Sequence, residues 1–147
     1  LYNALPRRNM KMDRKLKIGV FGGGRGIAMI NALLHHPSAE LVAVCDRYEP
    51  LLERAKKTAD EAGVEIALFT NFEDFLAYDI DAVVLANYFH EHAKYAIKAL
   101  EKNIHVLSEC TSNISMGEGV ALVRAVEKSN AYYMIAENIR YIEHENT

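Results

Sequence analysis

Residues 17–34, KIGVFGGGRGIAMINALL, decide the fold, because the sequence passes there from a strand pattern to a helix pattern through a run of glycines. Leu16–Phe21 is an apolar run of strand length, and a helical pattern follows it to about His35. Each glycine weakens a helix interior by about 0.5–1 kcal/mol relative to alanine. The run therefore predicts a turn that some ligand approaches closely. Its glycines are Gly22, Gly23, Gly24 and Gly26.

Strand and helix patterns alternate along the rest of the chain. Further strands are expected at 40–45, 65–69, 81–86, 104–108 and 132–137. Helices are expected at about 26–35, 50–63 with Pro50 in the first turn, 72–78 with Asn71 as cap, 90–102, and 117–129 after the capping box of Ser115 and Glu118. The strands are mostly continuous runs of Val, Ile, Leu and Ala, as in sheets that helices cover on both faces. The alternation predicts an α/β fold with a doubly wound parallel sheet of six strands.

Composition favours a globular domain that binds neither nucleic acid nor a membrane. The chain has 147 residues, of which half are hydrophobic and a quarter charged, and its formal net charge is −3. No apolar run approaches the roughly 18 residues of a membrane span. Cys45 and Cys110 are too few for a disulfide framework, which fits a reducing cytoplasm. We expect a flexible leader at 1–15, a dinucleotide-binding domain at 16–141 and a polar tail at 142–147.

The glycine turn and a later aspartate together predict a dinucleotide site. Gly22 and Gly24 give Gly-x-Gly, although Gly26 comes one place before the usual third glycine position. Asp46 ends the second expected strand and follows Gly24 by 22 residues. A carboxylate there can accept hydrogen bonds from the adenosine ribose and repels a 2′-phosphate, which favours NAD over NADP. Arg47 could stack on adenine or pair with a phosphate.

Other interpretations of these motifs remain open. The glycines could form a tight turn and nothing more. A methyltransferase also has such a turn, but it usually carries an acid late in the first strand, and KIGVF has none. His90, Glu91 and His92 invite a metal interpretation, yet they lack the His-Glu-x-x-His spacing that places two ligands on one helix face, so no metal is expected.

Four stretches resemble the N-terminal domain of the Gfo/Idh/MocA (glucose–fructose oxidoreductase / inositol dehydrogenase) family. They are GVFGGGRG, LVAVCDR, DAVVLANYFHEHAKYAIKALEKNIHVLSEC and AENIRY, and the resemblance runs from about residue 17 to 141. It implies a Rossmann-like domain that binds NAD(P) and belongs to an oxidoreductase acting on a sugar, polyol or related small molecule.

The third stretch is the most specific, and it departs from the family pattern at two places. Asn87 and Tyr88 stand where the family often has Thr-Pro, and His92 matches its helix-start histidine. Glu109 matches the glutamate of Glu-Lys-Pro, which in the family lies near the nicotinamide ribose. Cys110 replaces the lysine that the family uses to contact substrate and assist proton transfer. His92 and Cys110 are therefore the candidate catalytic residues, although a lone cysteine after a strand is more often a packed small hydrophobe.

The motifs and the resemblance together give an expected cofactor site. Its residues are Gly22, Gly24, Arg25, Gly26, Asp46, Arg47, Ala86, Asn87, Tyr88, His92, Glu109 and Asn138. Family members continue into a C-terminal substrate domain, so we expect a truncated, poorly active chain. The alternative is a non-catalytic NAD-responsive interaction module. We also expect an apolar surface near the last strand, covered by a second copy or a partner chain.

Overall fold

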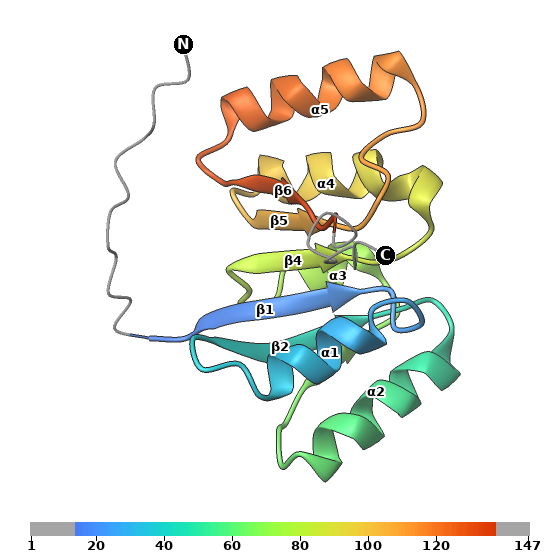
Figure 1. Ribbon diagram of the computed structural model, residues 1–147, viewed down its shortest axis with the longest axis vertical. Coiled ribbons are helices and arrows are strands. Elements are labelled where there is room, and N and C mark those ends of the chain that lie inside the picture. The colour runs from blue at the N-terminus through green and yellow to red at the C-terminus, as the bar shows by residue number, and fades with distance from the viewer. Residues whose placement is uncertain (1–13, 138–147) are drawn as a thin grey trace, which may run out of the picture.

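β1 (Leu16–Phe21) lies in the middle of a parallel sheet of six strands in the order β3-β2-β1-β4-β5-β6. The computed structural model describes residues 14–137, and Figure 1 shows their arrangement. The other strands are β2 (Ala39–Cys45), β3 (Ala67–Phe69), β4 (Ala82–Leu85), β5 (His105–Ser108) and β6 (Tyr133–Ile135). Every pairing between neighbouring strands is parallel. The predicted fold class is confirmed.

Helices cover both faces of the sheet. α1 (Ile27–Leu34) and α2 (Glu49–Glu61) pack on one face through residues such as Ile30 and Leu52. α3 (Phe72–Leu76), α4 (His92–Glu101) and α5 (Met116–Lys128) pack on the other. Because all six strands run the same way, their carboxyl ends share one edge, where open α/β sheets bind ligands.

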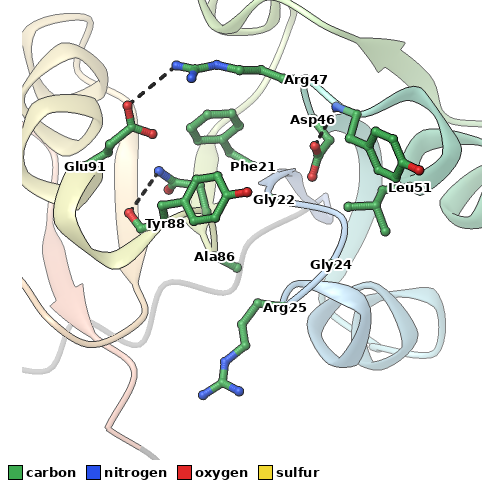
Figure 2. Close-up of a pocket in the computed structure, with 12 residues that line it drawn as sticks. Phe21, Gly22, Gly24, Arg25, Asp46, Arg47, Leu51, Ala86, Tyr88 and Glu91 are labelled. Carbon is green, nitrogen blue, oxygen red and sulfur yellow. Dashed lines mark hydrogen bonds and ion pairs between the residues drawn. The ribbon is translucent and has the colours of Figure 1, made fainter.

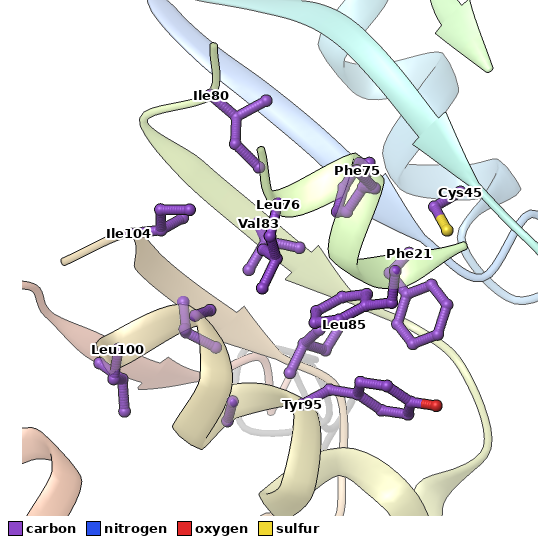
Figure 3. Packing of buried hydrophobic residues seen from close by; sticks show 14 of the residues in the cluster. Phe21, Cys45, Phe75, Leu76, Ile80, Val83, Leu85, Tyr95, Leu100 and Ile104 are labelled. Carbon is purple, nitrogen blue, oxygen red and sulfur yellow. The ribbon is translucent and has the colours of Figure 1, made fainter. Parts of the chain in front are cut away.

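The larger core cluster lies under α3 and α4 and consists mainly of aromatic and branched side chains (Figure 3). Phe21 from the end of β1 packs against Phe72 and Tyr95, with ring centroids 4.6 and 4.7 Å apart. Gly19 makes room for Phe75, because a Cβ at position 19 would lie 2.5 Å from its ring. This packing fixes the carboxyl end of β1 relative to α4.

Three predicted helix starts are confirmed. Pro50 lies in the first turn of α2, where its missing N–H costs no hydrogen bond. The Asn71 side chain accepts hydrogen bonds from the backbone of Glu73 and Asp74 at the start of α3. Ser115 and Glu118 form the reciprocal capping box of α5.

Some elements begin or end elsewhere than predicted. The helix predicted from residue 90 starts with a 3₁₀ turn, η1 (Phe89–Glu91), before α4 begins at His92. β3 is three residues long and starts two later than expected, because residues 62–64 still close the end of α2 through bonds to Ala59 and Asp60. The two edge strands, β3 and β6, are both shorter than the predicted strands at 65–69 and 132–137.

Arg14, which the sequence placed in the leader, contacts the sheet. Its guanidinium donates two hydrogen bonds to the Asp81 carboxylate, at 2.6 and 2.8 Å. Residues 1–13 of the predicted leader, Asn138 and the predicted tail lie outside the described residues. Among residues 14–137, no helix is both long and apolar enough to cross a membrane.

Candidate functional site

The turn after β1 needs glycine at two positions for reasons of backbone space. Gly22 has φ +104°, and a Cβ on it would lie 2.4 Å from the Ala86 carbonyl oxygen. A Cβ on Gly26 would lie 2.3 Å from the Gly22 oxygen, to which the Gly26 N–H donates at 2.9 Å. Gly24 differs, since a Cβ there would meet only Leu51 Cδ1, at 3.5 Å. The backbone requires Gly22 and Gly26, whereas Gly24 borders open space.

The same turn offers backbone donors to a ligand. Within residues 14–137, the N–H groups of Gly24 and Arg25 have no hydrogen-bond acceptor, and α1 begins at Ile27 without a side-chain cap. The N-terminus of a helix carries partial positive charge, so free N–H groups there favour an anion. A pyrophosphate fits this arrangement.

Two backbone N–H groups fix the carboxylate of Asp46 at the end of β2. Gly23 donates to Oδ2 at 2.7 Å and Tyr48 donates to Oδ1 at 2.9 Å. The carboxylate therefore lies directly beside the glycine turn (Figure 2).

A cavity of about 280 Å³ opens between the turn, the end of β2 and the loop after β4. Its lining comprises Phe21, Gly22, Gly24, Arg25, Asp46, Arg47, Tyr48, Leu51, Ala86, Asn87, Tyr88 and Glu91. Eight predicted cofactor residues are brought together here; Gly26, His92 and Glu109 do not line the cavity. The volume is near the lower limit of ordinary ligand pockets, which suits part of a dinucleotide.

Asn87 lines this cavity and carries a buried side-chain acceptor without a partner among the described residues. Its side-chain Oδ1 is buried and accepts no hydrogen bond from any described residue. A buried polar atom without a partner costs about 1–3 kcal/mol, so a ligand hydroxyl at this point would be stabilised.

His92, a candidate catalytic residue, is buried with only 1% of its surface exposed. Its Nδ1 lies 2.9 Å from the Thr111 carbonyl oxygen and its Nε2 lies 3.2 Å from the Asn87 carbonyl oxygen. The ring therefore joins the loop after β4 to the loop after β5. Glu109 lies at the end of β5, and its N–H donates to Leu85 at 2.9 Å.

Cys110 is exposed, so the expectation that it packs as a small hydrophobe is wrong. Its Sγ donates to Glu137 Oε2 at 3.1 Å, and this hydrogen bond raises the pKa of the thiol. Cys45 is fully buried, and burial raises its pKa to about 12. Both cysteines are free.

Several residues at the site are not among those predicted from the sequence. Arg54 of α2 belongs to a segment whose pattern is typical of a solvated helix face. Its guanidinium instead donates to the carbonyl oxygens of Gly23, at 3.3 Å, and Gly24, at 3.5 Å. Four more residues line the cavity: Phe21, Tyr48, Leu51 and Glu91. Phe21 directly precedes the glycine turn and Glu91 lies between His90 and His92, whereas no motif marks Arg54 or Leu51.

The neighbourhood of His90, Glu91 and His92 is not arranged for a metal. His90 is exposed whereas His92 is buried. In the part of the chain from 14 to 137, no three His, Cys, Asp or Glu side chains are grouped as a metal ion would require.

Comparison with known proteins gives a consistent result. Residues 16–137 match the family model GFO_IDH_MocA, described as an oxidoreductase family with an NAD-binding Rossmann fold. Glycosyl hydrolase family 109 protein 1 of Phocaeicola vulgatus is 32% identical over 138 residues, which cover 89% of this chain and 29% of the relative. The corresponding protein of Shewanella baltica is 28% identical, with 30% of the relative covered.

Comparison with solved structures leads to dehydrogenases of the same fold. Scyllo-inositol dehydrogenase from Lactobacillus casei, with bound NAD(H) and scyllo-inositol, has a TM-score of 0.80 at 25% identity, over 88% of this chain and 38% of that one. The WlbA dehydrogenase from Bordetella pertussis, in complex with NADH and UDP-GlcNAcA, has a TM-score of 0.78 at 30% identity, over 88% and 37%. The chain thus spans about a third of the length of the proteins it matches. It belongs to the Gfo/Idh/MocA oxidoreductase family and corresponds to that family's NAD-binding Rossmann domain.

Proposed function

We propose that this chain is the cofactor-binding part of an NAD(H)-dependent oxidoreductase that acts on a sugar, a polyol or a related small molecule. The observation that carries the proposal is the Asp46 carboxylate, fixed by the Gly23 and Tyr48 N–H groups at the edge of the cavity. An acid in that position suits the two ribose hydroxyls of NAD and repels the 2′-phosphate of NADP.

The residues fit the parts of the cofactor one by one. The free N–H groups of Gly24 and Arg25 would hold the pyrophosphate at the start of α1. Asp46 would accept hydrogen bonds from the adenosine ribose, with Leu51 and Tyr48 beside the adenine. The free Oδ1 of Asn87 would accept a hydrogen bond from a hydroxyl of the cofactor.

The nicotinamide end would lie toward the loops after β4 and β5. Tyr88 lines the cavity, and Glu109 is placed by its backbone bond to Leu85 at the end of the neighbouring strand. His92 lies between these loops with one ring nitrogen at the Asn87 carbonyl and the other at the Thr111 carbonyl, and the single N–H of a neutral imidazole donates to one of the two. We assign His92 a positioning role on the strength of its burial.

The substrate class rests on the relatives and is part of the proposal. The bound cofactor supplies hydride transfer, which needs the substrate held against the nicotinamide; such positioning supplies roughly 7–11 kcal/mol. The described residues offer one side of such a site. We therefore expect little turnover from this chain by itself.

Two arms of one experiment test the function. Calorimetric titration with NADH should give binding, and titration with NADPH should give weaker binding. Incubation with NAD and a panel of inositols, polyols and sugar derivatives should give little reduced cofactor by absorbance. Absence of NADH binding would refute the proposal. Steady turnover that is lost on changing Cys110 would refute the expectation of low activity.

A non-catalytic NAD-responsive module is the second candidate, and Cys110 favours it. This thiol stands where the family has a lysine, and a thiol has no positively charged form. The hydrogen bond to Glu137 also raises the pKa of the thiol, which disfavours the thiolate. Hydride transfer by this chain, with any substrate of the panel, would exclude a non-catalytic role. Because curated relatives are named as glycosyl hydrolases, aryl glycosides belong in that panel.

The surface over α5 and β6 is apolar, and this supports a proposal about which chains bind there. Several exposed apolar side chains line one hollow there: Met116, Val120, Val123 and Ile135. Contiguous apolar surface of this kind favours association, and we propose that a second copy or a partner chain covers it. Light scattering over a range of protein concentrations tests self-association. A cytoplasmic location is also proposed, on the basis of the free Cys45 and Cys110.

A further inference from the structure

The cavity is lined by an acidic and a basic residue at adjacent positions of the sequence. The acidic residue favours NAD, whereas the basic residue favours NADP. Asp46 disfavours a 2′-phosphate, whereas an arginine close to that position accommodates one. Arg47 lines the same cavity and has 64% of its side-chain surface exposed. From the sequence alone, Arg47 could attract NADP as strongly as Asp46 repels it.

In the structure the guanidinium of Arg47 is engaged on the far side of the cavity. Its Nη2 donates a hydrogen bond to the Tyr95 hydroxyl and lies 3.6 Å from Glu91 Oε1. Figure 2 shows the side chain extending away from Asp46 toward Glu91. Both contacts raise the pKa of Arg47, the Tyr95 contact more than the Glu91 contact.

Packing fixes both partners of Arg47. The side chain of Glu91 is only 19% exposed, and its N–H donates to the Tyr88 carbonyl oxygen at 2.9 Å within η1. Tyr95 follows one helical turn later on α4, is 4% exposed and packs against Phe21 and Phe72. Neither partner can follow Arg47 toward the ribose without loss of these contacts.

We infer that Glu91 determines cofactor specificity by holding Arg47 away from the 2′ position of the adenosine ribose. Glu91 also offsets the positive charge that would otherwise lie free beside the cavity. Asp46 then lies next to the 2′ position without the Arg47 guanidinium beside it. The inference rests on the proposed function, since it assumes that adenosine binds next to Asp46.

The test compares four variants by calorimetric titration with NADH and NADPH. Glu91→Gln keeps the size of the side chain and removes its charge. Tyr95→Phe keeps the packed ring and removes only the hydroxyl. Arg47→Ala combined with Glu91→Gln removes the released cation. Glu101→Gln is the matched control, because Glu101 is an exposed acid at the C-terminal end of α4, the helix that follows Glu91.

We expect Glu91→Gln to tighten NADPH binding by about five- to tenfold, because the released guanidinium of Arg47 can then make one charge-assisted hydrogen bond to the 2′-phosphate. NADH affinity should stay within about a factor of two. Tyr95→Phe should act in the same direction, whereas Glu101→Gln should leave both affinities as in the original chain. The gain in NADPH affinity should be absent when Arg47→Ala is combined with Glu91→Gln. Melting temperatures of the variants report whether each is folded.

An unchanged NADPH-to-NADH ratio in folded Glu91→Gln would overturn the inference and leave the proposed function intact. A gain that persists without Arg47 would also overturn it, because Glu91 would then act through its own charge. Failure of the original chain to bind NADH would refute the proposed function and the inference with it.

Discussion

The backbone N–H of Gly23 donates a hydrogen bond of 2.7 Å to Asp46 Oδ2, so the end of β2 is tied directly to the turn after β1. The two residues are 23 positions apart in the sequence. Because parallel strands end at one edge of the sheet, this bond joins the two motifs from which the sequence predicts a dinucleotide site. Its consequence is that the carboxylate has one orientation before any ligand binds.

Asp46→Ala should weaken NADH binding by about tenfold or more, since hydrogen bonds to a charged group contribute roughly 1.5–3 kcal/mol. NADPH binding should fall much less, because the variant also removes the repulsion of the 2′-phosphate. Calorimetric titration of both cofactors measures the ratio. Asp60→Ala, an exposed acid of α2 that pairs with Lys56, is the control. Equal losses for the two cofactors would show that Asp46 acts on the fold instead of the ribose.

Gly24 and Gly22 should respond differently to a side chain. Gly24→Val should leave the fold intact, since Leu51 Cδ1 at 3.5 Å is its one near neighbour, and should abolish NADH binding by filling the space of the pyrophosphate. Gly22→Ala should destabilise the chain itself, because φ is +104° and the new Cβ would meet Ala86 at 2.4 Å. Thermal unfolding and calorimetry separate the two effects. Normal NADH binding by Gly24→Val would contradict the assignment of the pyrophosphate to this turn.

The fold and the centre of the site could be predicted because they depend on local patterns and on one rule of topology. Strand-like runs, caps and the glycine turn are visible in short windows, and parallel strands bring the turn and Asp46 together. Arg54 and Tyr95 could not be found this way, since their side chains reach the turn and Arg47 across 30 or more positions of sequence. The exposure of Cys110 depends likewise on which segments cover the end of β5.

Asp81 should make stability depend on pH in the acid range. Hydrogen bonds from Arg14 and from the Lys17 N–H lower its pKa from 3.8 to about 2. Because the pKa is lower in the folded state, the stabilisation is present above pH 4 and is lost as the pH falls toward 2. Asp81→Asn should cost about 1 kcal/mol of unfolding free energy at pH 7, a figure reduced because Arg14 is largely exposed.

Urea unfolding at pH 7, 4 and 2.5 tests this dependence. The difference between Asp81→Asn and the original chain should shrink steadily as the pH falls. Asp79→Asn is the control, since the Asp79 side chain is 79% exposed and its pairing with Lys17 is screened by water. A difference that stays constant with pH would show that charge at Asp81 is not its source.

His92→Ala should destabilise the chain by about 2–4 kcal/mol, because it opens a cavity and leaves two loop carbonyls without the imidazole. His92→Gln should recover part of the loss, since an amide can donate to one of the carbonyls. His90→Ala, two positions away and exposed, should have little effect. Urea unfolding without any substrate measures these values. A normal unfolding curve for His92→Ala would remove the case for a positioning role.

The two thiols should react at very different rates. Burial raises the pKa of Cys45 to about 12, so this thiol should react with an aromatic disulfide reagent only after the chain is unfolded. Cys110 is exposed and should react in the native state, although the hydrogen bond to Glu137 raises its pKa and slows the reaction.

Glu137→Gln should accelerate the reaction of Cys110 at pH 8, and Cys110→Ser should abolish it. Absorbance of the released thiolate follows both rates. Equal reaction of two thiols in the folded chain would contradict the burial of Cys45, and an unchanged rate in Glu137→Gln would contradict the influence of Glu137 on Cys110.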